Sequence, residues 1–135
     1  MLEKISHIGI AVFDIEKSLK LYRDILGMKV VDRMKVEDMG LEVIFLDSGN
    51  TYLELLQPLN ENNTIYKFLN KKGEGIHHIS YEVDDIETAL QTLADSGIEL
   101  IDKKPRIGAW GEPIAFLHPK STGGVLIELE QKKNK

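Results

Sequence analysis

The chain has 135 residues, of which 42% are hydrophobic and 29% charged, a composition typical of globular proteins rather than disordered or fibrous ones. This length suits one domain with one substantial core. A net charge of −5 argues against a general nucleic-acid or anionic-membrane surface, so we expect neither partner. The absence of cysteine excludes disulfides and thiolate metal sites and favours a cytoplasmic location, and the longest apolar run is too short for a membrane span.

The first element in chain order is a strand with alternating polarity at residues 6–13, followed by an amphipathic helix. Asp14 is suited to cap the start of this helix, and Gly27 to end it. One face of the helix carries the apolar residues Ile15, Leu19, Tyr22 and Leu26. Three further strands are predicted at about 28–36, 41–46 and 52–57, and a short linker helix at about 60–73.

The second half of the chain repeats this pattern at a shift of 71 residues, with ISHIGIAVFDIEKSL lying over IHHISYEVDDIETAL. Its predicted strands are 76–83, 98–103, 114–118 and 125–130, with a helix capped by Asp85 after the first of them. The unit is βαβββ, twice, which predicts an α+β fold. We expect one domain over 1–135, made of module 1 (about 4–59), the linker helix (about 60–73) and module 2 (about 74–131). Because a module of this size rarely supplies a core alone, the modules are expected to share one, and a homodimer is expected.

The repeat singles out one of two adjacent histidines. His7 aligns with His78, not with His77, so one histidine recurs at the same position of the first strand of each copy. Neighbouring side chains of a strand point to opposite faces, so His77 shares a face with the apolar residues beneath the helix. The small residues Gly9 and Ser80, two positions after His7 and His78, leave room for a cavity. We expect His7 and His78 to serve one site and His77 to be structural.

The last strand of each copy adds a polar side chain to each histidine. Gln57 and Glu128 align at the same shift, and each lies 50 residues after the histidine of its own copy. A lone strand histidine is more often structural than a ligand, but the repetition favours a metal site. Two imidazoles, one amide oxygen and one carboxylate form a mixed nitrogen and oxygen set for a divalent first-row metal. The predicted metal ligands are His7, Gln57, His78 and Glu128.

Three segments, HIGIAV, GEGIHHISYEVDDIE and IAFLHPKSTGGVLIELEQ, closely resemble the methylmalonyl-CoA epimerases, a family of the vicinal oxygen chelate (glyoxalase-like) superfamily. The resemblance implies a curved mixed sheet around a metal-containing cavity, with the metal held by the same four residues. It implies interconversion of (2R)- and (2S)-methylmalonyl-CoA through removal of the proton α to the thioester, with the metal stabilising the enolate. One divalent ion is implied, for which we expect Co²⁺, with Mn²⁺, Ni²⁺ or Zn²⁺ as alternatives.

The resemblance also suggests the acid and base residues. Glu128 is the expected base, as the matching glutamate is in glyoxalase I. Some relatives have a glutamate on the third strand where this chain has Val43, so the second acid or base is open between His118 and Asp47, with His118 preferred. The frequent GAHG of the family reads GAWG here, with Trp110 in place of a histidine.

The substrate implied by the resemblance is an acyl-CoA, which carries several negative charges. Basic and hydroxyl side chains that could meet its phosphates or carboxylate are Lys103, Lys104, Arg106, Lys120 and Ser121, of which we retain Arg106, Lys120 and Ser121 as substrate-binding candidates. Three alternative functions stay open: a glyoxalase I-type isomerase (lactoylglutathione lyase), an Fe(II) oxygenase, and a non-enzymatic small-molecule-binding protein of the same superfamily. The fourth ligand, Gln57, disfavours the oxygenase because it occupies a position that oxygen chemistry needs.

Overall fold

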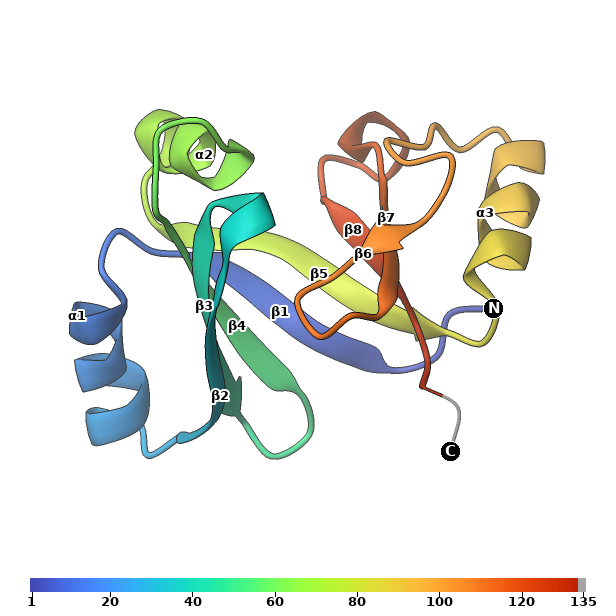
Figure 1. Cartoon of the computed structure of the whole chain (residues 1–135). Helices are drawn as coiled ribbons and strands as arrows, with labels where there is room; N and C mark the ends of the chain where they lie inside the picture. Colours follow the sequence, from blue (N-terminus) through green and yellow to red (C-terminus); the bar gives the residue numbers. More distant parts are fainter. Residues whose placement is uncertain (134–135) are drawn as a thin grey trace. The chain divides into compact units, whose positions relative to one another are not determined.

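The computed structural model describes residues 1–133, which contain eight strands, three α-helices, one π-helical turn and two 3-10 turns (Figure 1). In chain order these are β1 (Ile5–Ala11), α1 (Ile15–Leu19), the π-helical turn η1 (Lys20–Ile25), β2 (Lys29–Val36), η2 (Glu37–Met39), β3 (Leu41–Asp47), β4 (Tyr52–Pro58), α2 (Thr64–Lys72), β5 (Gly75–Val83), α3 (Ile86–Asp95), β6 (Arg106–Ile107), β7 (Pro113–Leu117), η3 (Pro119–Ser121) and β8 (Ile127–Gln131). No helix in this part of the chain is long and apolar enough to cross a membrane.

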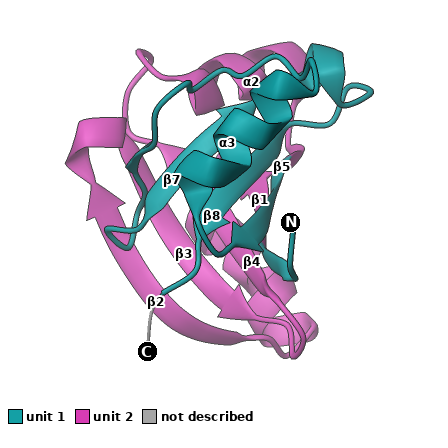
Figure 2. Ribbon diagram, turned by 90° about the vertical axis from the view of Figure 1, so that its right-hand side faces the viewer, with its two compact units in different colours: residues 1–6, 78–135 teal, residues 7–77 magenta. Residues whose placement is uncertain are grey.

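The chain divides into two compact units, coloured separately in Figure 2. Unit 2 comprises residues 7–77 and orders its strands β2-β3-β4-β1; unit 1 comprises residues 1–6 with 78–135 and orders its strands β5-β8-β7-β6. The predicted βαβββ pattern and the α+β class are confirmed. The boundaries of the units differ from those of the predicted modules, because the chain passes from one unit to the other inside β1 and inside β5.

In unit 2, β1 runs parallel to β4, and β3 is antiparallel to both β2 and β4. One face of these strands packs against α1 through a cluster of buried apolar side chains: Ile10, Val12, Ile15, Leu19, Ile44, Leu46, Leu53 and Leu55. Alternation therefore turns the even-numbered residues of β1 and the odd-numbered residues of β4 toward the helix. The other face of the same strands carries the buried polar residues His7 and Glu54 beside the buried apolar residues Val43 and Phe45.

The helix that begins unit 2 starts as predicted and ends differently. The Asp14 side chain accepts hydrogen bonds from the backbone N–H groups of Glu16 and Lys17, as an N-cap does. After α1 the chain widens into η1, where the N–H of Leu26 donates to the carbonyl of Leu21, five residues back. The wider turn rotates Leu26 out of the predicted apolar stripe, and it is 54% exposed.

Unit 1 repeats the arrangement, with β5 parallel to β8 and β7 antiparallel to β8 (Figure 1). Its core beneath α3 consists of Val83, Ile86, Ala89, Leu90, Ala115, Leu117 and Leu129. The predicted cap is confirmed, because the Asp85 side chain accepts the N–H of Thr88. Gly97 ends the helix region with a φ of +87°, a conformation that favours glycine, as Gly27 does with a φ of +79° in unit 2.

The strand predicted at 98–103 is reduced to an isolated bridge between Leu100 and Leu117, followed by the two-residue strand β6. A side chain interrupts the ladder at this point: the carboxylate of Asp102 accepts the N–H of Phe116 at 2.8 Å. The sequence KKP follows directly, and Pro105 has no N–H with which to continue the pairing. Pairing resumes at Arg106, which lies opposite Ile114.

Candidate active site

His7 is buried in unit 2 beside a carboxylate that the sequence analysis did not select. Its Nε2 lies 3.3 Å from Oε1 of Glu54, and the two side chains are only 5% and 9% exposed. The ring of Phe45 meets the imidazole edge to face, with the ring centres 5.9 Å apart. A buried imidazole held by a carboxylate and an aromatic ring has a fixed orientation, which suits a metal ligand.

Strand register explains why Glu54 reaches this face. Gly9, two residues after His7, pairs with Glu54 on the parallel neighbour β4. Register partners in adjacent strands project from the same face of a sheet, so Glu54 shares the face of His7 and Gly9. Leu53 and Leu55, on either side of Glu54, pack in the core beneath α1.

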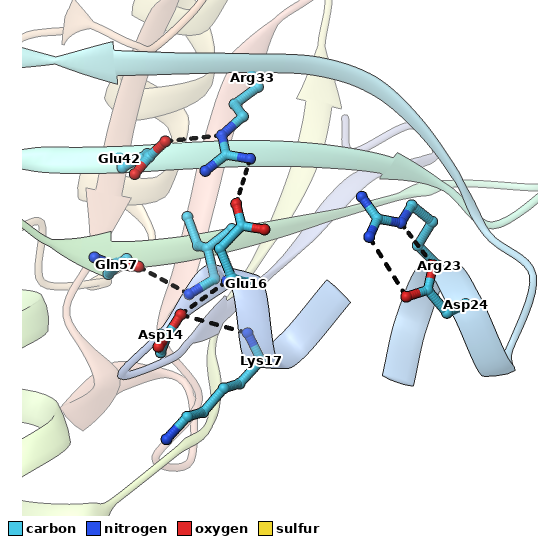
Figure 3. A network of polar contacts seen from close by, with 9 residues as sticks. Asp14, Glu16, Lys17, Arg23, Asp24, Arg33, Glu42 and Gln57 are labelled. Atoms are coloured by element: carbon cyan, nitrogen blue, oxygen red, sulfur yellow. Dashed lines mark hydrogen bonds and ion pairs between the residues drawn. The ribbon is translucent and has the colours of Figure 1, made fainter. Parts of the chain in front are cut away.

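Gln57 lies on the opposite face of β4 from Glu54, because three positions separate them. Its side-chain oxygen accepts the backbone N–H of Ile15 at 2.8 Å, at the first turn of α1, as Figure 3 shows for the labelled Gln57. The N–H groups at the start of a helix have no partner within the helix, and Gln57 satisfies one of them. The structure therefore does not bring Gln57 to the face of His7; it brings Glu54 there.

A matching arrangement occurs in unit 1. His78 is 4% exposed, and its imidazole meets the ring of Phe116 edge to face, with the ring centres 5.6 Å apart. Glu128 is also 4% exposed and lies opposite Phe116 on the neighbouring strand β8. On the other side it pairs in register with Ser80 of β5, two residues after His78. His78, Ser80, Phe116 and Glu128 thus share one face of unit 1.

The counterpart of Gln57 in unit 1 is Gln131, not Glu128. The side-chain oxygen of Gln131 accepts the N–H of Ile86 at the start of α3, at 3.0 Å. Glu54 and Glu128 are equivalent in the same way, because each pairs with the residue two positions after its histidine.

The last strands therefore align as ELLQ over ELEQ, at a shift of 74 residues instead of 71. The missed signal is this segment, in which three of four residues match. It was hidden because the segment between the last two strands is longer in the second copy, residues 118–126, than in the first, residues 48–51.

Val43 and Glu42 lie as the alternation of β3 predicts. Val43 is buried on the Phe45 face, whereas Glu42 points to the opposite face and accepts a hydrogen bond from Nε of Arg33 at 2.8 Å (Figure 3). Glu16 forms a second ion pair with the same guanidinium at 2.7 Å. These two carboxylates, Glu42 first, raise the pKa of Arg33. Glu42 is thus part of an ion-pair network on the helix side of unit 2.

His118, the predicted second acid or base, caps the turn η3. Its Nδ1 accepts the N–H of Lys120 at 3.0 Å, and its Nε2 lies 3.6 Å from Glu99. Ser121 accepts the N–H of Glu99 through its hydroxyl group at 2.9 Å. The side chain of His118 is 43% exposed. These contacts engage His118 and Ser121 in holding the turn between β7 and β8.

The substrate-binding candidate Arg106 lies against an aromatic ring of unit 1. Its guanidinium lies over the ring of Phe116, 5.2 Å from the ring centre, and 3.3 Å from the carboxylate of Asp102. Arg106 pairs with Ile114, which shares its face with Phe116. The same aromatic ring thus contacts both Arg106 and His78.

The donor atoms fit a divalent metal. Each unit offers one buried imidazole and one buried carboxylate, His7 with Glu54 and His78 with Glu128. Nitrogen and oxygen donors of this kind suit Co²⁺, Ni²⁺, Mn²⁺ and Zn²⁺. His77, by contrast, meets Phe68 of α2 edge to face, with the ring centres 5.1 Å apart.

Comparison with known proteins gives the family. Residues 6–116 match the glyoxalase/bleomycin resistance protein/dioxygenase superfamily. The chain is 44% identical over 133 residues to an ethylmalonyl-CoA/methylmalonyl-CoA epimerase of Cereibacter sphaeroides, covering 97% of this chain and 99% of that one. It is also 44% identical over 131 residues to the human mitochondrial methylmalonyl-CoA epimerase, covering 96% of this chain and 74% of that one.

Among solved structures, a variant of the Streptomyces coelicolor methylmalonyl-CoA epimerase in complex with 2-nitronate-propionyl-CoA superimposes with a TM-score of 0.90. It is 36% identical to this chain, and the match covers 98% of this chain and 96% of that one. With the repeated histidine and carboxylate pairs, these similarities show that the chain belongs to the methylmalonyl-CoA epimerase family of the glyoxalase/bleomycin resistance protein/dioxygenase superfamily.

Proposed function

We propose that this protein is an isomerase that interconverts the (2R) and (2S) forms of methylmalonyl-CoA, using one divalent metal ion. The observation that carries the proposal is the buried imidazole and carboxylate pair found in each unit of a chain that belongs to the epimerase family. Epimerisation removes the proton on the carbon between the thioester and the carboxylate and returns a proton to the opposite face. The thioester carbonyl that becomes an enolate is restored when the proton returns, so the reaction makes no net change to a bond with oxygen and oxidises nothing.

The metal ligands that we propose are His7 and Glu54 from unit 2, and His78 and Glu128 from unit 1. Glu54 replaces Gln57 in this set because the amide oxygen of Gln57 already accepts the N–H of Ile15 on the helix side of β4. A divalent ion bound by these groups supplies Lewis acidity toward the thioester oxygen. One divalent ion per chain is proposed, so a calorimetric titration with Co²⁺ should saturate at one ion per chain.

Glu128 is the proposed base that takes the α-proton. Its burial at 4% exposure keeps water away from the carboxylate, and the neighbouring Phe116 forms an apolar wall on β7. His118 stays the proposed second acid or base. Its test is His118→Gln, which should slow epimerisation at C2 while leaving the affinity for Co²⁺ unchanged.

The anionic parts of the acyl-CoA need cationic or hydrogen-bonding partners, for which we propose Arg106, Lys120 and Ser121. Arg106 is supported most directly, because Asp102 and the Phe116 ring hold its guanidinium on the face of Glu128. Arg106→Gln should raise KM more than it lowers kcat if the guanidinium binds the substrate.

We also propose a cytoplasmic homodimer. The large apolar side chains Phe13, Leu21 and Ile107 are exposed in the single chain and support association. Light scattering coupled to size-exclusion chromatography measures the mass directly, and a single-chain mass of 15.3 kDa would contradict the dimer.

The test of the function is solvent deuterium incorporation at C2 of methylmalonyl-CoA, followed by proton NMR with and without Co²⁺. Exchange that depends on the metal, lost in Glu128→Gln, is the expected result. A folded, Co²⁺-loaded protein that shows no exchange would sink the epimerase function. The same preparation assayed with a glutathione hemithioacetal would then test the glyoxalase alternative.

A further inference from the structure

Ser80 has a buried hydroxyl group that no contact within the described part of the chain explains. The residue is 0% exposed, and its Oγ has no hydrogen-bond partner among residues 1–133. Burying a hydroxyl without a partner destabilises a protein, because the group gives up its hydrogen bonds to water. Such a group in a folded protein calls for a specific explanation, and a role in a bound state is one.

The acceptor nearest in register is Glu128. Ser80 on β5 and Glu128 on β8 are partners in adjacent parallel strands and project from the same face. Such strands lie about 4.8 Å apart, so rotation about the side-chain bonds can bring the hydroxyl and a carboxylate oxygen into contact. A serine hydroxyl already donates to a glutamate in the same unit, from Ser6 of β1 to Oε2 of Glu130 at 2.7 Å, although β5 lies between their strands.

Unit 2 has no hydroxyl at the equivalent position. Gly9 pairs in register with Glu54, just as Ser80 pairs with Glu128, and glycine has no side chain to donate. Glu54 lies against Nε2 of His7 at 3.3 Å. The two carboxylates are thus equivalent in strand position and differ in the donor beside them, so Ser80 distinguishes Glu128 from Glu54.

We infer that Ser80 is a positioning residue, whose hydroxyl donates a hydrogen bond to the carboxylate of Glu128 when Glu128 binds the divalent metal. This inference rests on the proposed function, because it takes Glu128 as a metal ligand. The hydrogen bond fixes the orientation of the carboxylate, which strengthens metal binding, and it satisfies the hydroxyl at the same time. In the metal-free protein, by contrast, the hydroxyl contributes no bond and is a source of instability.

The test compares Ser80→Ala with the parent protein in both states. In the metal-free state the variant should be at least as stable as the parent in a urea titration, because it loses a hydroxyl that made no bond. Its affinity for Co²⁺, measured by calorimetry, should fall about tenfold or more. The visible absorption spectrum of bound Co²⁺ should also change, because the geometry of the Glu128 ligand is no longer fixed.

Two further variants serve as controls. Ser80→Cys keeps the size of the side chain and a weak donor, and it should restore part of the lost affinity. Ser6→Ala removes a hydroxyl that does have a partner, so it should destabilise the metal-free protein where Ser80→Ala does not.

Two results would overturn the inference. One is a Co²⁺ affinity and spectrum of Ser80→Ala equal to those of the parent. The other is a clear loss of stability in the metal-free variant, which would show that the hydroxyl is already bonded without metal. Glu128→Ala separates this failure from failure of the proposed metal site. If it binds Co²⁺ as tightly as the parent, Glu128 is not a ligand, and both proposals fail together.

Discussion

Glu54 and Gln57 lie three positions apart on β4, and this odd spacing puts their side chains on opposite faces of the sheet. Both are polar residues on β4, but Glu54 contacts the imidazole of His7 and Gln57 caps the start of α1. A strand turns successive side chains to opposite faces, so an odd separation is enough to move a group from one face to the other. Whether a β4 residue faces His7 or α1 depends on whether its position in the strand is even or odd, more than on which polar residue it is.

This difference predicts opposite outcomes for two substitutions. Glu54→Ala should abolish tight Co²⁺ binding in a calorimetric titration, because it removes a proposed ligand. Gln57→Ala should bind Co²⁺ as the parent does but lose about 1 kcal/mol of unfolding free energy, because an N–H at the start of α1 loses its partner. If Gln57→Ala loses the metal and Glu54→Ala retains it, the ligand assignment in unit 2 is reversed.

At the residue scale, a surface ion pair between Lys132 and Glu3 predicts how the Glu3 carboxyl titrates. Lys132 lies 3.1 Å from Glu3, and their hydrogen bond is the main cause that lowers the pKa of the Glu3 carboxyl. A carboxyl with a lowered pKa in the folded state adds stability above its unfolded pKa, and loses it as the pH falls through the folded pKa. Carbon-detected NMR should show the Glu3 pKa below its usual range, and Lys132→Met should move it back up. An unchanged Glu3 pKa in Lys132→Met would exclude the ion pair as the cause.

At the scale of single elements, the helix of unit 2 departs most from a regular pattern. A regular helix from Ile15 would keep Leu26 on the face that packs against the strands. After Leu19, however, the π-helical turn η1 has more residues per turn than an α-helix, which rotates the following side chains off that face. The stripe therefore ends early. Leu19 is 1% exposed, while Leu26 is 54% exposed.

Because of η1, substituting Leu19 and Leu26 with alanine should change the free energy of unfolding by different amounts. Leu19→Ala should lower the unfolding free energy by about 2–5 kcal/mol, because it opens a cavity in the core. Leu26→Ala should change it by less than about 0.5 kcal/mol, because the side chain is already in water. Urea unfolding of both variants measures this. Equal losses would mean that the helix continues in a regular α-helical form through Leu26.

At the scale of the whole molecule, metal binding should raise the free energy of unfolding. A ligand that binds only the folded state stabilises it by about 2.7 kcal/mol at a hundred times its Kd. Excess Co²⁺ should therefore raise Tm in calorimetry, and EDTA should return it to the metal-free value. Mg²⁺ prefers oxygen ligands and serves as the control, so an equal shift with Mg²⁺ would indicate a site without imidazole ligands.

Much of this fold could be predicted because its signals are local. Asp14, Gly27 and Asp85 act through hydrogen bonds or backbone angles within a few residues, so their roles are visible in the sequence. The repeat of His7 as His78 gave the histidine face directly, because both lie in strands that align without a gap.

The errors arose where pairing is not local. The shift of 71 residues pairs Gln57 with Glu128, but the turns before β4 and β8 differ in length, so strand register makes Glu54 the equivalent of Glu128. The strand at 98–103 failed because the Asp102 side chain, 14 residues away from Phe116 in sequence, takes the place of a backbone partner. The ELLQ and ELEQ segments carry the first equivalence at a different shift, whereas the Asp102 contact has no signature in its own stretch of sequence.

The offset between the repeats and the compact units has a consequence for descent by duplication. Unit 1 includes residues 1–6, where the N–H of Glu3 donates to the carbonyl of Glu82 and the N–H of Glu82 donates to the carbonyl of Lys4. A half-length chain that carries the second repeat alone lacks this segment and leaves the backbone groups of Glu82 open to other strands. Only a strand exchanged from another copy of that half-length chain could take the place of residues 1–6. Fusion into one gene makes that exchange intramolecular, so the segment is always present at high effective concentration.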